Sequence, residues 1–199
     1  MKLVVATKNA HKIHELSEML AIDGLTLVSL ADVGFTGEIE ENGATFAENA
    51  LIKARAAAKF CGLPALADDS GLCVDALDGE PGIYSARYAS ADGENASDAA
   101  NVEKLLEKLK GIPSGERTAR FVCAIALVLP DGSEKTVTGA CEGVITSEVR
   151  GNGGFGYDPV FYYVPYCKTF GEATEDEKNA VSHRANAVRL IKQKLLELR

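Results

Sequence analysis

The sequence lacks the features that mark nucleic-acid-binding proteins and membrane proteins. It has no run of basic residues, and its 199 residues carry a formal net charge of −8. Neutralisation of phosphates by Lys and Arg supplies much of the affinity for nucleic acids, so we expect no nucleic-acid partner. No apolar stretch approaches transmembrane length, so we expect no membrane partner either.

The cysteines form no C-x-x-C pair and no disulfide framework. They are Cys61, Cys73, Cys123, Cys141 and Cys167. An odd number of scattered cysteines is typical of a reducing compartment, where a free cysteine behaves as a small buried hydrophobic residue. The apolar run at residues 3–6 is too short for a secretory signal. We therefore expect a cytoplasmic protein.

The composition provides ample material for a core, with 46% hydrophobic and 25% charged residues. These proportions are typical of an ordinary globular protein, and we expect residues 1–199 to form a single domain. An acidic chain of this kind can still bind an anionic nucleotide if a metal ion bridges the two negative partners.

Strands and helices alternate through the first third of the chain, which is typical of an α/β fold. We predict strands at 3–7, 25–30, 63–67, 72–77, 119–129, 134–142 and 160–164, and helices at 9–20, 45–61, 97–109 and 182–198. The segments at 119–129 and 134–142 resemble a hairpin, so the sheet is expected to be mixed. Thr45 and Glu48 predict a capping box for the second helix. Asn49 and Lys53 share its other face, for which solvent exposure is the simplest interpretation.

The first candidate site is the pattern Thr7-x-Asn9-x-x-Lys12-x-x-Glu15, where a strand ends and a helix begins. Backbone N–H groups and the positive end of the helix dipole at such a junction suit a polyphosphate. The alternative is that Thr7 or Asn9 only caps the helix and that Lys12 is solvated. The glycines of a Walker A loop are missing.

The second candidate site is acidic. Asp68 and Asp69 lie in a predicted turn at 68–71, and Glu38, Glu40 and Glu41 lie on the loop before the second helix. Mg²⁺ prefers carboxylate oxygens and often needs only one or two of them besides substrate phosphates. The alternative is an ordinary acidic surface. That alternative is weaker for the aspartates, because adjacent like charges after an apolar strand are costly without a cation.

Two further segments near the C-terminus are unusual. Residues 151–156 match G-x-G-x-x-G, but a strand follows where a dinucleotide-binding fingerprint requires a helix. The alternatives are a glycine-rich hairpin, or a loop that lets its backbone approach a ligand and carries Phe155 to stack on a base. Ser182-His183-Arg184 places two basic residues in the first helical turn, where the dipole disfavours cations.

Six segments, in order along nearly the whole chain, resemble those of the inosine triphosphate pyrophosphatases, which act on noncanonical purine nucleotides. These segments are residues 6–12, 43–50, 67–72, 81–88, 153–159 and 182–184. The resemblance implies a long twisted mixed β-sheet flanked by helices, two lobes with a central active-site cleft, and a homodimer. It also implies Mg²⁺-dependent hydrolysis of ITP, dITP and XTP to the nucleoside monophosphate and pyrophosphate.

The resemblance also implies residue roles. Phosphates would be held by Thr7, Lys8, Asn9, Ala10, His11, Lys12 and Ser70, and the rest of the nucleotide by Phe155, Gly156, Tyr157, Asp158, Lys178, His183 and Arg184. Glu40 and Asp69 would serve the metal. Asp69 would accept the proton, unless Asp68 or a second water does so, and Lys53 would join Lys12 in offsetting phosphate charge. From the chemistry of the purine ring, we predict that His183 and Arg184 donate to its 6-oxygen.

Two alternatives remain open. One is a nucleotide-binding sensor without hydrolysis, and the other is a related pyrophosphatase for modified pyrimidine or methylated guanine nucleotides. The sequence departs from the family pattern at Gly171 and Ala173, where relatives tend to be bulkier. That departure concerns local packing.

Overall fold

The computed structural model describes residues 1–198, and within them a seven-stranded sheet has the order β2-β1-β3-β4-β5-β6-β7. The strands are β1 (Lys2–Val5), β2 (Thr26–Ser29), β3 (Ala65–Val74), β4 (Thr118–Val128), β5 (Glu134–Ile145), β6 (Phe161–Tyr163) and β7 (Lys168–Thr169). The helices are α1 (Ala10–Met19), α2 (Phe46–Cys61), α3 (Asp98–Lys108), α4 (Glu175–Val181) and α5 (His183–Leu196). β1 runs parallel to β2 and β3, whereas β6 is antiparallel to β5 and β7. The predicted mixed α/β sheet is confirmed.

The chain divides into two compact units. The first contains residues 1–69, 123–139 and the chain from residue 184 on, and the second contains residues 70–122 and 140–183. Both units carry residues that the sequence singles out.

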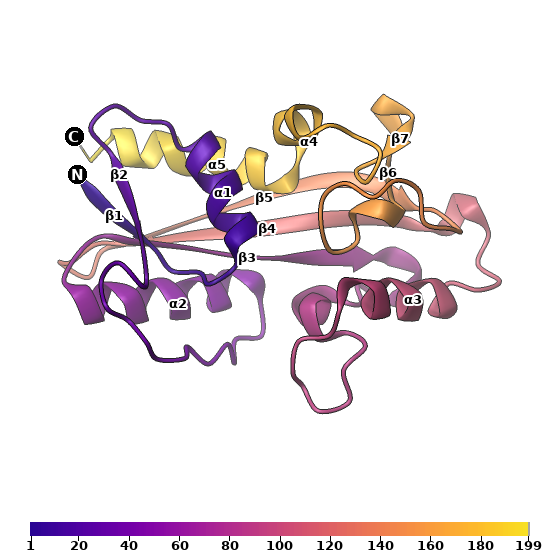
Figure 1. The fold of residues 1–199 in the computed structure, drawn as a ribbon, viewed down its shortest axis with the longest axis horizontal. Coiled ribbons are helices and arrows are strands. Elements are labelled where there is room, and N and C mark those ends of the chain that lie inside the picture. The colour runs from indigo at the N-terminus through magenta and orange to yellow at the C-terminus, as the bar shows by residue number, and fades with distance from the viewer. Residues whose placement is uncertain (199) are drawn as a thin grey trace. The chain divides into compact units, whose positions relative to one another are not determined.

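The sheet of the first unit is covered on both faces. Leu3, Val5 and Leu66 belong to a core cluster with residues of α1 and α5, whereas Val4, Ala65 and Ala67 belong to a cluster with the alanines of α2. Successive side chains of a strand point to opposite faces, which explains this alternation. Figure 1 shows α2 on one side of β1 and β3, and α1 and α5 on the other.

β3 corrects one prediction. The predicted turn at 68–71 is wrong, because the chain continues as strand from Ala65 to Val74 and bends only at the 3₁₀ turn Asp75–Leu77. Adjacent carboxylates and a glycine are typical of turns in sequence. Here both carboxylates are buried beside cations from other elements, and that compensation permits a continuous strand.

α2 has the predicted bounds but not the predicted surface. Thr45 caps the helix by accepting from the Glu48 N–H, while the Glu48 carboxylate accepts from Ala44 N–H at 2.7 Å instead of from Thr45. The capping box is therefore only half formed. Asn49 is 1% exposed and Lys53 is 7% exposed, so the solvent-exposed interpretation of that helix face is wrong.

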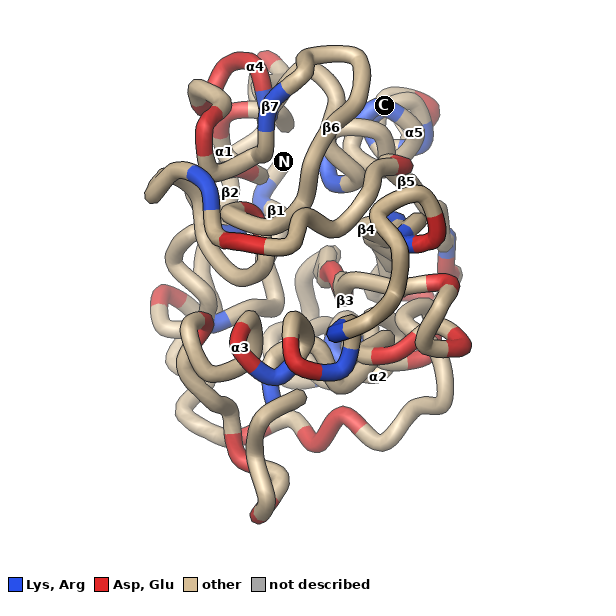
Figure 2. The backbone as a smooth tube through the Cα atoms, turned by 90° about the vertical axis from the view of Figure 1, so that its right-hand side faces the viewer, with Lys and Arg blue, Asp and Glu red and all other residues tan. Residues whose placement is uncertain are grey.

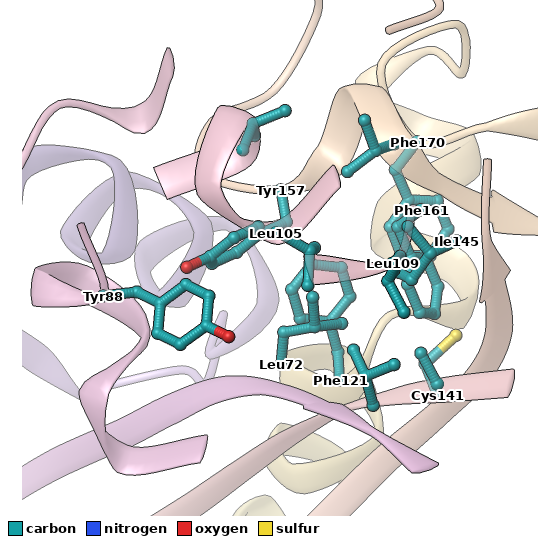
Figure 3. Close-up of a cluster of buried hydrophobic side chains, with 14 residues drawn as sticks. Leu72, Tyr88, Leu105, Leu109, Phe121, Cys141, Ile145, Tyr157, Phe161 and Phe170 are labelled. Atoms are coloured by element: carbon teal, nitrogen blue, oxygen red, sulfur yellow. The ribbon is translucent and has the colours of Figure 1, made fainter. Parts of the chain in front are cut away.

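The second unit has an aromatic core. Tyr88, Phe121, Tyr157, Phe161 and Phe170 pack with leucines of β3 and α3 (Figure 3). The predicted hairpin is confirmed as β4 and β5.

α4 was not predicted, although the pattern Thr174-x-x-Glu177 is a capping box that could have revealed it. Ser182, expected as the start of the last helix, also ends α4.

Charges of both signs are interspersed along the backbone. α3 carries Glu103, Lys104, Glu107 and Lys108, and Figure 2 shows red and blue segments close together on this helix. Among the described residues, no helix is both long and apolar enough to cross a membrane.

Candidate active site

Asp68 and Asp69 lie next to each other on β3 and point to opposite faces of the sheet. Asp68 contacts Lys12 of α1 and Arg184 of α5, whereas Asp69 contacts Asn49 and Lys53 of α2. The period of two along a strand separates the two carboxylates, although they are adjacent in sequence. The cations that this acidic pair requires are thus supplied by the protein itself.

Asp68 is fully buried and closely paired with cations. Its Oδ2 lies 3.1 Å from Lys12 Nζ and 3.1 Å from Arg184 Nη2. Arg184, itself 1% exposed, also binds Glu15. Burial alone acts to raise the pKa of Asp68, but attraction to Lys12 and Arg184 outweighs it and holds that pKa well below its usual range. Asp68 is therefore ionised at neutral pH and is a weak proton acceptor.

Asp69 has the opposite electrostatic balance. Its Oδ1 lies 3.2 Å from Lys53 Nζ, and its Oδ2 accepts from Asn49 Nδ2 at 3.2 Å. Burial raises the pKa of Asp69, Lys53 opposes that effect, and the negative charge of Glu41 adds to it; the net direction is upward. A raised pKa brings a carboxylate closer to the value that general-base chemistry favours.

Lys53 joins Asp69 to Glu41, whose Oε2 lies 2.8 Å from Lys53 Nζ. Burial disfavours the charged form of Lys53, but Asp69, Asp68 and Glu41 together outweigh burial and raise the pKa of this lysine. The sequence also left open that Lys12 is solvated. That interpretation is wrong, because the Lys12 side chain is 14% exposed and is paired with Asp68.

Among the loop acids, the structure brings Glu41 to Lys53, while Glu38 and Glu40 are exposed. The role of Glu40 as a metal ligand stays a prediction. Glu15 and Glu41 belong to the first two candidate sites, and Asn49 is singled out on the second predicted helix, but the sequence assigns none of the three a specific role. Glu15 follows Lys12 by three residues and so shares its side of α1.

Asn9 is the N-cap of α1, so the capping alternative holds for Asn9. Thr7 Oγ1 accepts from Asn9 N–H, and Asn9 Oδ1 accepts from Lys12 N–H, both at 3.2 Å. Residues 8–11 are exposed. Capping does not conflict with phosphate binding, because an exposed helix start offers the positive end of its dipole to an anion. Phosphate contacts at residues 7–12 stay a prediction.

In the second unit, the glycine-rich loop is organised around Asp158. The buried Asp158 Oδ2 lies 2.7 Å from Lys178 Nζ and accepts from Phe155 N–H at 2.9 Å. Lys178 Nζ in turn lies 4.5 Å from the centre of the Phe155 ring. Gly154 has φ +70°, and a Cβ there would lie 2.1 Å from the Asp158 carboxylate, so only glycine fits. Three of the predicted nucleotide-binding residues thus lie together.

The motif Ser182-His183-Arg184 spans the boundary between the two units, so His183 and Arg184 have different surroundings. The ring of His183 stacks on Phe121 at 4.8 Å in the second unit, whereas Arg184 binds Asp68 and Glu15 in the first. Ser70 is partly buried on β3. The predicted contacts of Ser70, His183 and Arg184 with a nucleotide stay predictions.

Gly171, a departure from the family pattern, has a structural reason. A Cβ at Gly171 would lie 2.8 Å from the Arg150 carbonyl oxygen, and one at Gly151 would lie 2.2 Å from the Gly171 backbone. The two glycines therefore permit a close backbone approach that a side chain at either position would block.

The first unit of this α/β fold places buried carboxylates and lysines around one strand, which is the kind of charged site that enzymes use for acid–base chemistry. The sequence profile of the Ham1 family matches residues 3–194, and the chain belongs to that family. The dITP/XTP pyrophosphatase of Geobacter sulfurreducens is 55% identical over 98% of this chain and 96% of its own. The dITP/XTP pyrophosphatase of Desulforamulus reducens is 54% identical over 95% and 92%. The solved Ham1 protein of Staphylococcus aureus has a TM-score of 0.90 at 41% identity, covering 100% of both chains.

Proposed function

We propose that this protein hydrolyses purine nucleoside triphosphates that carry a noncanonical base, such as ITP, dITP and XTP, to the monophosphate and pyrophosphate. The names of its relatives support the substrate class, and the single structural observation that carries the proposal is Asp69. This carboxylate is buried against Lys53 and has a raised pKa, whereas the neighbouring Asp68 is paired with Lys12 and Arg184.

Phosphate charge would be offset by Lys12 and Lys53 and by the exposed start of α1. Each lysine is held in place by an aspartate of β3, so the charges are fixed before substrate arrives. Preorganised charge of this kind stabilises a transition state without reorganisation at the moment of reaction.

Asp69 would take the proton of the attacking water. Asn49 holds its Oδ2, and Asn49 Oδ1 is fixed by the Gly43 N–H at 2.8 Å, so the carboxylate is oriented. A carboxylate that also contacts a metal directly is a weaker base, because the cation lowers its pKa.

The donor set fits Mg²⁺. Asp69 and Glu41 offer carboxylate oxygens on either side of Lys53, and hard cations prefer such ligands; Glu40 is the ligand that the family resemblance implies. Bound Mg²⁺ would neutralise phosphate charge and lower the pKa of a bound water. We propose Mg²⁺ dependence, a homodimer and a cytoplasmic location as parts of the same hypothesis.

Phe155 would stack on the base, and His183 and Arg184 would donate to the 6-oxygen that inosine and xanthosine share. Adenosine carries an amino group there, and a buried donor left unpaired costs ~1–3 kcal/mol. We expect Arg184→Ala to raise KM for ITP and to narrow the ITP-to-ATP ratio of kcat/KM. Phe155→Ala should weaken both nucleotides alike. If Arg184→Ala left the ITP-to-ATP ratio of kcat/KM unchanged, Arg184 would not recognise the base. Its role would then be structural, through its ion pairs with Asp68 and Glu15.

The direct test is pyrophosphate release from ITP, XTP, GTP, ATP and dTTP, each with Mg²⁺ and again with excess chelator. We expect fast release from ITP and XTP, slow release from the others, and none with chelator. Binding of ITP without release would favour the sensor instead. Preference for a modified pyrimidine or methylated guanine triphosphate would favour the related pyrophosphatase.

A further inference from the structure

Phe155, Gly156 and Tyr157 are consecutive residues of one loop, and each of them donates a hydrogen bond. Phe155 N–H donates to Asp158, and the Tyr157 hydroxyl donates to the Ser85 carbonyl at 2.8 Å. The third bond is the least expected: Gly156 N–H donates to Asp98 Oδ2 at 2.6 Å. Asp98 is the first residue of α3 and is 58 positions away in sequence.

We infer that Asp98 is a positioning residue for the base, because its carboxylate holds the Gly156 amide and so fixes the loop that presents Phe155. Gly156 has φ +61°, and Gly154 on the other side of Phe155 has φ +70°. Glycines at both sides give the loop many alternative conformations. An anchor on the Gly156 amide removes many of them before a nucleotide arrives.

The anchor has a physical effect on affinity. A loop that is already ordered spares the nucleotide the entropy of ordering it, so the ring is ready to stack. Lys178 over the ring and Asp158 on the Phe155 amide hold the loop at Phe155, and Asp98 holds it at Gly156. A carboxylate that accepts from a backbone N–H makes one of the stronger hydrogen bonds.

The inference rests on the proposed role of Phe155, and three substitutions at one position test it. Asp98→Asn keeps an acceptor in place, Asp98→Glu keeps the charge in the first turn of α3 but moves the carboxylate, and Asp98→Ala removes both. We expect Asp98→Ala and Asp98→Glu to raise KM for ITP about fivefold, the effect of one net hydrogen bond, with kcat little changed. Asp98→Asn, which keeps an acceptor but loses the charge, should have a KM between those of wild type and Asp98→Ala. Asp92→Ala is the matched control, since it removes an exposed carboxylate from the loop before α3.

A double-mutant cycle separates positioning from general loss of structure. Because Asp98 acts through Phe155, Asp98→Ala should have almost no effect on KM in a Phe155→Ala background. An equal effect of Asp98→Ala in both backgrounds would overturn the inference. It would also be overturned if KM depended only on the negative charge at the start of α3, so that Asp98→Glu behaved like wild type and Asp98→Asn like Asp98→Ala.

Amide hydrogen exchange without any nucleotide keeps this test independent of the proposed function. Asp98→Ala should speed exchange at Gly156 and leave the amides of α2 unchanged. Unchanged exchange at Gly156 would overturn the inference whatever the substrate is. Faster exchange together with a wild-type protein that cleaves none of the triphosphates would instead refute the proposed function and leave the anchor intact.

Discussion

On the face of β3 that packs with α1 and α5, Asp68 is buried between Lys12 and Arg184, and its pKa is lowered. On the face that packs with α2, Asp69 has one close lysine, which it shares with Glu41, and its pKa is raised. A lowered pKa means that the fold favours the ionised carboxylate, and a raised pKa means that the fold opposes it. Two adjacent residues of one type therefore affect stability in opposite directions.

The largest expected effect comes from Asp69→Asn. The substitution removes the proposed base, and loss of one positioned acid–base group lowers the rate by about 10²–10⁴. The melting temperature should change little, because the raised pKa of Asp69 opposes its ionised form while the buried Lys53 ammonium loses one of its partners. Steady-state pyrophosphate release and thermal unfolding of the same sample check both statements. Wild-type turnover would remove Asp69 from the mechanism.

Asp68→Asn should have its main effect on stability. It leaves Lys12 and Arg184 buried without their shared counter-charge, and breaking a buried ion pair typically costs ~3–5 kcal/mol. Urea unfolding monitored by circular dichroism measures the loss. If Asp68→Asn unfolds like wild type while Asp69→Asn is destabilised, the assignment of the two faces is reversed.

The two lysines extend the comparison to the cations. We expect Lys12→Ala and Lys53→Ala each to lower kcat/KM about 10- to 100-fold, the effect of one lost hydrogen bond to a charged group. Lys53→Ala should also raise the pKa of Asp69 further, because the positive charge of Lys53 is the main influence that lowers it. The acidic limb of its pH–rate profile should then move to higher pH. A lysine whose removal lowers only the melting temperature is structural.

The smallest expected effect is the pH dependence of Asp68. Its folded pKa lies below the ordinary value of 3.8, so its stabilising contribution is complete above that pH and is lost as the pH falls below it. The difference in unfolding free energy between wild type and Asp68→Asn should be constant from neutral pH to about pH 5. It should shrink on further acidification, and a difference that grows there would contradict the lowered pKa.

Much of the fold could be predicted from sequence, because helices such as α2 and the β4–β5 hairpin have local signals. The residues of the site could be named, but their environments could not. No residue near Asp68 in sequence indicates that Arg184 is its partner. That pairing permits Asp68 to be buried, and so permits residues 68–71 to form a strand instead of a turn. The apolar stripe of α2 did not reveal that Lys53 is also buried, because the charges that permit its burial come from β3 and from the loop before the helix.

The alternation of β3 has an evolutionary consequence. Asp and Asn codons differ by one nucleotide, so a single base change at position 69 would remove the proposed base while the stabilising Asp68 network stays intact. Such a descendant would keep its fold and its lysines and would hold a triphosphate without cleaving it. With Asp69 as the proposed base, a nucleotide sensor is one mutational step from this enzyme. The adjacent codons for Asp68 and Asp69 would then be selected for different properties, the first for stability and the second for catalysis.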